Sequence, residues 1–105
     1  AKEDDKDAAP DKKLGLAVQP LTPELAKRFG YSETEGVVVV SVNPASPAAV
    51  AGLRRGDVIR EINRAPVKNM KDYNNGLAEA LKNDSVLFLV KRGPSTVYVV
   101  IRLKE

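Results

Sequence analysis

GLRRGDVI, residues 52–59, combines a helix end, a turn and the start of a strand in one short stretch. Gly52 follows a short apolar run and stands where a helix places its C-terminal glycine, because glycine adopts the left-handed backbone without steric cost. Gly56 suits a turn for the same reason, and Asp57 is placed to accept local backbone hydrogen bonds. A strand is predicted over 57–62. We therefore expect these residues to build the fold rather than to form a ligand site.

Capping signals predict three helices. Thr22-Pro23 and Ser46-Pro47 each place a capping side chain before a proline at the first helical position. The first pair predicts a helix at about 23–29, closed by Gly30, and the second a helix of little more than one turn that Gly52 closes. Asn69 caps the longest predicted helix, at about 70–82, with Asp72 at the acidic position of a capping box.

Alternating and β-branched residues predict the strands. They cover 14–18, 36–42, 57–62, a short extended piece at 66–67, about 85–91 and about 96–103. Val97, Val99, Ile101 and Leu103 form one face of the last strand. The sum is an α+β, mainly β domain: a small antiparallel β-barrel or sandwich of five to six strands, capped by two to three helices.

Residues 1–13 differ in composition from the rest of the chain. They contain no large apolar residue, and their five acidic residues and four lysines are closely interspersed. Such a segment cannot bury apolar surface, so we expect a flexible linker or tail at 1–13 and one folded domain at 14–105. The folded part carries thirteen basic and nine acidic residues, scattered rather than gathered in a stripe. That scatter argues against nucleic-acid binding.

The composition excludes several catalytic sites. The 105 residues include no histidine and no cysteine, which rules out a Ser-His-Asp triad, a Cys-His pair and a disulfide within this chain. No phosphate-binding glycine loop and no acidic calcium loop is present. We therefore predict that the chain is not an enzyme by itself and takes no cofactor or metal. No apolar run is long enough for direct membrane insertion.

GLRRGDVI, with Asn63 four residues further on, resembles the GL+xGDxIxxxN signature of PDZ domains. The preceding VNPASPAA at 42–49 and the later Arg92-Gly93 resemble the same family. The order of elements is that of the bacterial, circularly permuted members. LGLAVQPLTPELAKRFGY at 14–31 is most similar to the second, C-terminal PDZ domain of HtrA/Deg-type periplasmic serine proteases. The sequence departs from the family at Arg64, where the family usually has glycine. The arginine changes the geometry of a turn that is remote from the expected groove.

The resemblance implies a peptide-binding site in which the ligand adds a strand to an exposed sheet edge. Leu14, Gly15 and Leu16 stand at the carboxylate-binding loop, and the amides of Gly15 and Leu16, with Leu14 as a third candidate, are expected to hold the ligand's terminal carboxylate. Leu14 and Leu16 are also expected to line the pocket for its last side chain.

The expected groove runs between the strand Leu16–Val18 and the helix at 70–82. Met70, Asn74 and Leu77 are predicted to wall it, with Tyr73 mainly in the core, and Ala78 and Leu81 are the alternatives if the helix is rotated. Ala17 offers its backbone, Val18 belongs more to the core, and Lys13 is a weaker candidate for long-range attraction. The predicted groove residues are Lys13, Ala17, Val18, Met70, Tyr73, Asn74, Leu77, Ala78 and Leu81.

By the same resemblance, the chain is expected to be a non-catalytic part of a periplasmic serine endopeptidase. Its partners would be polypeptide C-termini or extended apolar segments of unfolded proteins, together with other domains and subunits of the parent protease. Two alternatives remain open: a module that serves assembly of the protease, and a PDZ domain of another bacterial protease or secretion component.

Overall fold

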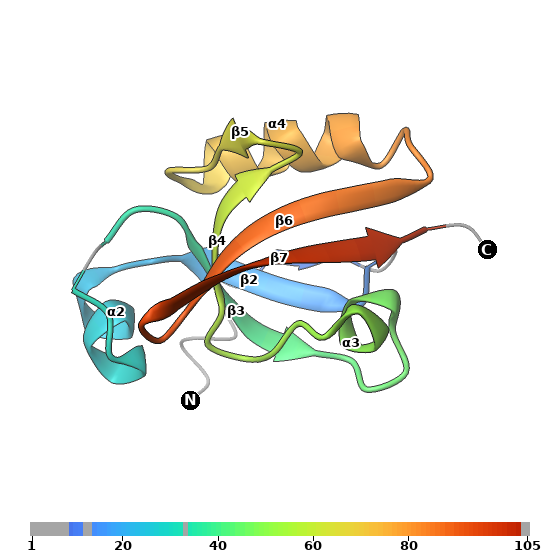
Figure 1. The fold of residues 1–105 in the computed structure, drawn as a ribbon. Coiled ribbons are helices and arrows are strands. Elements are labelled where there is room, and N and C mark those ends of the chain that lie inside the picture. The colour runs from blue at the N-terminus through green and yellow to red at the C-terminus, as the bar shows by residue number, and fades with distance from the viewer. Residues whose placement is uncertain (1–8, 12–13, 33, 104–105) are drawn as a thin grey trace.

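The computed structural model describes residues 9–11, 14–32 and 34–103, which form one antiparallel sheet with three helices (Figure 1). The strands are β1 (Ala9–Asp11), β2 (Leu16–Pro20), β3 (Val37–Val42), β4 (Val58–Ile62), β5 (Ala65–Pro66), β6 (Ser85–Arg92) and β7 (Ser95–Arg102). The helices are α2 (Pro23–Phe29), α3 (Pro47–Ala51) and α4 (Met70–Ala80). The sheet order is β1-β2-β3-β4-β6-β7, with β5 paired to β4 beside that path. The predicted mainly β domain is confirmed, as an open sheet rather than a closed barrel.

The predicted helix caps form as expected. The Thr22 hydroxyl accepts a hydrogen bond from the Leu25 N–H at 3.2 Å, and the Ser46 hydroxyl accepts one from the Ala49 N–H at 3.1 Å. Gly30 and Gly52 close these two helices with φ values of 83° and 101°. Short helices have little intrinsic stability, so such side-chain and glycine caps decide where they begin and end.

Helix α4 begins at the predicted cap and ends at Ala80, two residues before the predicted end. The Asn69 side chain accepts from the Asp72 N–H at 2.9 Å. The Asp72 carboxylate accepts from the Lys68 N–H at 3.1 Å, one residue before the cap that a regular capping box would use. In the part of the chain that the structure describes, no helix is long and apolar enough to cross a membrane.

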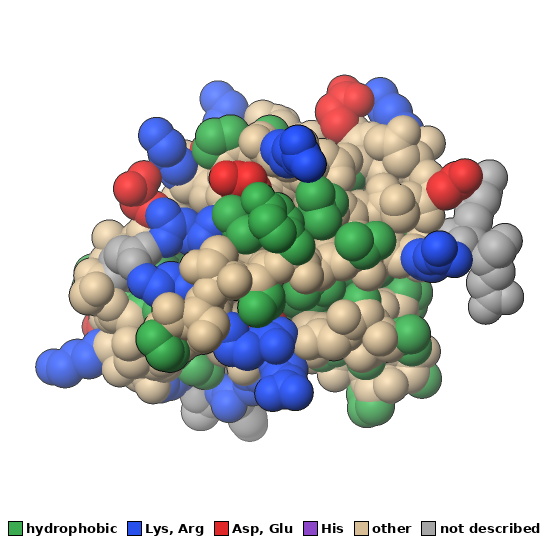
Figure 2. Space-filling model, in the orientation of Figure 1, with side chains coloured by type: hydrophobic (Ala, Val, Ile, Leu, Met, Phe, Trp, Pro, Cys, Tyr) green, Lys and Arg blue, Asp and Glu red, His purple; other side chains and the backbone are tan. Residues whose placement is uncertain are grey.

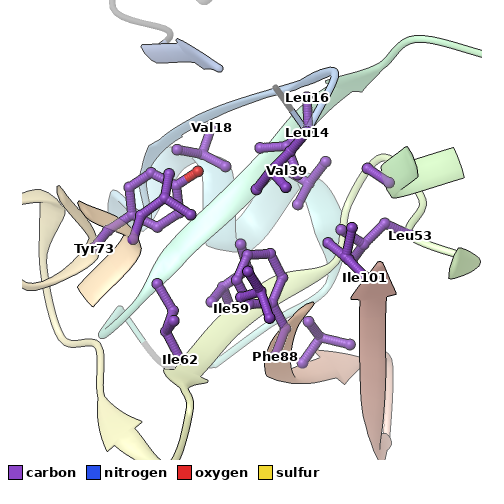
Figure 3. Packing of buried hydrophobic residues seen from close by; sticks show 14 of the residues in the cluster. Leu14, Leu16, Val18, Val39, Leu53, Ile59, Ile62, Tyr73, Phe88 and Ile101 are labelled. Atoms are coloured by element: carbon purple, nitrogen blue, oxygen red, sulfur yellow. The ribbon is translucent and has the colours of Figure 1, made fainter. Parts of the chain in front are cut away.

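The main core lies on one face of the curled sheet. Figure 3 shows side chains of β2 and β3, such as Val18 and Val39, facing those of β4 and β6, such as Ile59 and Phe88, and all four are fully buried. Neighbouring strand residues point to opposite faces, so Val38 belongs to a second, smaller cluster under α2. Helix α2 therefore covers the back of the sheet, and α4 covers the main core.

The segment expected to stay outside the fold contributes a strand. Ala9, Pro10 and Asp11 pair antiparallel with Val18, Ala17 and Leu16 of β2. The prediction of a linker with no part in the fold is thus wrong for these three residues. Backbone pairing does not require the large apolar side chains on which that prediction rested. Residues 1–8 and 12–13 lie outside the described residues, and the boundary of the domain at residue 14 stays a prediction.

The turn between β4 and β5 carries the departure at Arg64. Asn63 and Arg64 both have positive φ, 50° and 70°, as a two-residue hairpin turn requires. Asparagine suits its position because its side-chain oxygen also accepts from the Leu87 N–H at 2.9 Å. Arginine has no such compensation, and the left-handed backbone costs a non-glycine residue about 1–2 kcal/mol.

A buried ion pair joins the GLRRGDVI stretch to the end of β6. The Asp57 carboxylate is 1% exposed and accepts two hydrogen bonds from Arg92, at 2.9 and 2.6 Å, and one from the Arg54 N–H at 3.0 Å. Arg92 also donates to the Gly52 carbonyl at 2.9 Å, at the end of α3. Its hydrogen bond to Asp57 raises the pKa of the Arg92 guanidinium, and an arginine is charged at working pH in any case. The architectural role predicted for Asp57 is confirmed.

Gly15 positions the loop before β2 by allowing a close approach. Its φ is +79°, and a Cβ there would lie 2.0 Å from the Cβ of Ser46, at the start of α3. Only glycine fits both constraints. Gly76, in the middle of α4, is different, because a Cβ there would lie 3.4 Å from the nearest atom of Ile62, an ordinary contact.

Replacing Arg92 by glutamine should lower the free energy of unfolding by about 2–4 kcal/mol, because it leaves the buried Asp57 carboxylate without its charged partner. Urea denaturation measures the change. Arg54→Gln is the matched control: Arg54 serves Asp57 through its backbone, so this substitution should cost less than about 0.5 kcal/mol. Equal losses in the two variants would contradict the assigned role of the ion pair.

Gly15→Ala and Gly76→Ala should have opposite effects on stability. The first forces a Cβ into Ser46 in a left-handed backbone and should cost about 3 kcal/mol or more. The second replaces a helical glycine where space exists and should gain about 0.5–1 kcal/mol. Thermal or urea denaturation compares them. A neutral Gly15→Ala variant would show that this approach is not tight.

Candidate functional site

The candidate site is the edge of β2 that does not pair with β3, together with the loop that precedes it; in the structure β1 pairs with this edge from Leu16 to Val18. Leu14, Leu16 and Val18 are 0%, 3% and 0% exposed, and all three belong to the main core. Their side chains pack in the core and so fix the position of the strand. The parts of this segment left to meet a ligand are therefore its backbone groups, with the two leucines forming the floor beneath them.

Two hydrogen bonds orient the peptide groups of the loop. The Leu14 carbonyl accepts from the Ala48 N–H of α3 at 3.0 Å, and the Gly15 carbonyl accepts from the Asn43 N–H at 2.7 Å. In a planar trans peptide, the N–H of the following residue points opposite to the carbonyl. The amides of Gly15 and Leu16 therefore both point away from α3 and the end of β3. Two adjacent N–H donors on the same side of a loop form an anion-binding arrangement.

Helix α4 supplies the opposite side of the groove. Tyr73, Leu77 and Ala80 are its buried residues, and Figure 3 shows Tyr73 pointing into the core toward the part that Val18 lines. Asp72, Gly76 and Glu79 lie on one flank of that buried stripe, against the β4–β5 hairpin, where they line a surface hollow with Ile62. The other flank lies on the opposite side of the buried stripe from this hollow.

That second flank holds four of the predicted groove residues. Met70, Asn74, Ala78 and Leu81 follow one another at spacings of four, four and three, so they share one side of the helix. Met70 and Leu81 are partly buried, whereas Asn74 and Ala78 are exposed. The structure buries Tyr73, as expected, and also Leu77. Leu77 was expected on the groove wall, but its position in line with Tyr73 turns it inward.

The remaining predicted groove residues are Ala17, Val18 and Lys13. Ala17 is 8% exposed and Val18 is fully buried, and a β-bulge between them shifts the register of β2 against β3. Lys13 lies outside the described residues. Within the described ranges, no group of three or more acidic side chains is placed to hold a metal ion.

Sequence analysis missed Asn43 and Ser46 as supports of the loop. Ser46 was interpreted only as a helix cap, and it does cap α3, but it also packs against Gly15. Asn43 donates its backbone N–H to Gly15 and accepts from the Ala45 N–H through its side chain at 2.9 Å. Backbone contacts between distant segments leave no signature in residue types, so a single sequence could not indicate them.

A second surface combines exposed apolar residues with a hollow. Val50 of α3 is 86% exposed, and Tyr98 and Val100 of β7 are 62% and 53% exposed. A hollow of about 650 Å³ between α3 and β7 is lined by Val50, Val100 and Arg102, among others. Figure 2 shows hydrophobic side chains gathered over the region of β6 and β7 and again around α3. Ser46, which packs against Gly15, also lines this hollow, so the surface adjoins the loop before β2.

Comparison with known proteins agrees with this geometry. The family model for the PDZ domain matches residues 12–103. A probable periplasmic serine endoprotease, DegP-like, from Chlamydia muridarum is 42% identical over 94 residues, which is 89% of this chain and 19% of that protein. A putative serine protease, HhoB, from Synechocystis is 32% identical over 97 residues, 85% of this chain and 23% of that protein. The chain thus spans about a fifth of the length of these relatives.

Two similar solved structures contain peptides. The PDZ domain of HtrA3 bound to a phage-derived ligand, FGRWV, has a TM-score of 0.71 and 25% identity, and the match covers 85% of this chain and 81% of that one. The HtrA-type protease AlgW with a decapeptide has a TM-score of 0.75 and 35% identity over 85% of this chain and 27% of that one. Fold, sequence motifs and relatives agree: this chain belongs to the PDZ domain family and is homologous to the PDZ region of DegP/HtrA-type serine proteases.

Proposed function

We propose that this domain binds the C-terminal, apolar segments of unfolded polypeptides by strand addition to β2. The observation that carries the proposal is that the Leu14 and Gly15 carbonyls are both bound by backbone amides of the segment from 43 to 48, which directs the Gly15 and Leu16 amides away from that segment. In this arrangement the ligand's terminal carboxylate accepts from the two amides, its backbone pairs with β2, and its last side chain lies between the strand and the Met70–Asn74 flank of α4. The similar structures with peptides support peptide binding by this kind of domain.

We further propose that the domain is a non-catalytic part of a periplasmic HtrA/Deg-like protease. The relatives named as periplasmic serine endoproteases support this context, and its place as the second PDZ domain rests on the resemblance of residues 14–31. The domain would capture misfolded chains for a catalytic domain elsewhere in the protein. Weak capture suits this task, because the bound chain must be released to the protease.

The expected affinity for one peptide is modest. A charged hydrogen-bonded group contributes about 1.5–3 kcal/mol net, and one buried apolar side chain contributes about 1.5–3 kcal/mol more. The backbone bonds of the added strand must also offset the entropy lost on association. A dissociation constant of about 1–100 µM follows, and several domains held in one assembly would bind more tightly through avidity.

Titration with the pentapeptide FGRWV should shift the backbone amide NMR signals of Gly15, Leu16 and Ala17. The C-terminally amidated peptide is the control and should bind at least about tenfold more weakly, because its neutral end accepts weaker hydrogen bonds. Resonances of Asn63 and Leu87, at the distant β4–β5 turn, should not move. Equal binding of the two peptides would disprove carboxylate recognition by the loop.

A second candidate function, contact with other subunits or domains of a protease assembly, is favoured by the α3–β7 surface. A side chain as large and as exposed as Val50 is more typical of an interface than of a solvated helix. In this alternative the domain serves assembly, and β2 need not bind peptide at all.

Val50→Asp separates the two functions. If the α3–β7 surface mediates contact between copies, concentrated wild-type chain should self-associate in sedimentation velocity, and the aspartate variant should remain monomeric because a charge in an apolar contact is costly. Peptide affinity should not change in either case, because the exposed Val50 side chain is not among the groove residues. Monomeric behaviour of both proteins at the highest concentration would argue against self-assembly through this surface.

A further inference from the structure

We propose that β1 is an intramolecular competitor for the peptide edge of β2, so that a ligand must displace Ala9–Asp11 before it can bind. This inference rests on the proposed function, because it concerns the regulation of the same edge. In this proposal β1 regulates access of the peptide to β2. The composition of residues 1–13 had indicated only a linker.

The sheet topology makes the two occupants mutually exclusive. A strand has only two hydrogen-bonding edges. One edge of β2 pairs with β3 along its whole length, from Leu16 to Pro20. The other edge pairs with β1 from Leu16 to Val18. A peptide that adds to this part of β2 therefore requires that β1 leave.

The direction of β1 matches the direction expected of a ligand. A peptide whose terminal carboxylate lies at the loop before β2 must run antiparallel to β2, with its last residue near Leu16. Strand β1 also runs antiparallel, and its last residue, Asp11, pairs with Leu16. The segment thus occupies the backbone positions of the last three residues of a bound peptide.

β1 is nevertheless a weak occupant. Opposite residues of an antiparallel pair are hydrogen-bonded only at alternate positions, so β1 offers β2 at most the N–H groups of Ala9 and Asp11. The chain continues from Asp11 into Lys12, so β1 has no terminal carboxylate for the Gly15 and Leu16 amides. A C-terminal peptide supplies this carboxylate. It therefore gains hydrogen bonds that β1 cannot make, and displacement is favourable at sufficient peptide concentration.

The short connection gives β1 its ability to compete. Only residues 12–15 separate it from β2, and a tether this short holds the segment at an effective concentration of the order of millimolar. A pairing of three residues is marginal by itself, so paired and unpaired forms are both populated. The apparent dissociation constant of a peptide is then its intrinsic value divided by the fraction of unpaired β1.

Two sets of substitutions shift this equilibrium in opposite directions within the full chain. Ala9→Pro with Asp11→Pro removes the remaining amide hydrogens of β1 and should lower the apparent dissociation constant for FGRWV about threefold or more. Pro10→Val puts a β-prone residue in the middle of β1, and should raise that constant by a similar factor. Ala1→Pro with Asp4→Pro is the matched control, with the same residue types replaced outside β1, and should leave it unchanged.

Isothermal titration gives these constants, and amide hydrogen exchange of Leu16, Ala17 and Val18 without peptide gives a second readout. Exchange should be slower in Pro10→Val and faster in the variant with prolines at 9 and 11. Equal peptide affinities in all variants would overturn the competition while leaving peptide binding intact. Failure of every variant to bind, including the one without β1 donors, would instead overturn the proposed function. Binding only after β1 is disrupted would support both.

Discussion

The buried ion pair between Asp57 and Arg92 is the constraint from which the candidate site is built outward. It fixes the Arg54–Asp57 turn against the end of β6. Arg92 also donates a hydrogen bond to the Gly52 carbonyl at the end of α3. At the start of helix α3, Ser46 packs against Gly15. The Ala48 N–H of the same helix donates to the Leu14 carbonyl. The Asp57 side chain is 1% exposed, and a buried carboxylate without a charged partner is costly. Breaking the Asp57–Arg92 ion pair would therefore carry a large energetic cost.

The candidate site consists mainly of backbone groups that such contacts orient. Leu14 and Leu16 serve as buried floor, and the two loop carbonyls are bound on the inner side. Peptide planarity then directs the Gly15 and Leu16 amides outward. A site of this kind recognises a carboxylate and an extended backbone more than a particular side chain. Such recognition suits the proposed capture of unfolded chains with varied sequences, and β1 would limit it to ligands that bind better than the chain's own segment.

Much of the fold could be predicted because its signals are local. Thr22, Ser46 and Asn69 cap the expected helices, and Gly30 and Gly52 end two of them. Two expectations from the sequence failed for the same reason, because each depended on which segments meet in space. Ala9–Asp11 were assigned to a linker because they lack large apolar residues, yet strand pairing uses the backbone. Leu77 was assigned to the groove because its spacing from Met70 and Asn74 fits one helix side as well as the other, and only the packing of α4 distinguishes them.

The sequence by itself determined the family, the order of the elements and the importance of Gly15, because caps, turns and strand alternation depend on residues that are close along the chain. Only the tertiary structure decided why Gly15 is needed, which is the approach of Ser46 from a segment thirty residues away. It also decided which side of α4 is buried, and that β1 pairs with β2. These facts depend on which backbones meet in space, and backbone groups are the same for nearly every residue type.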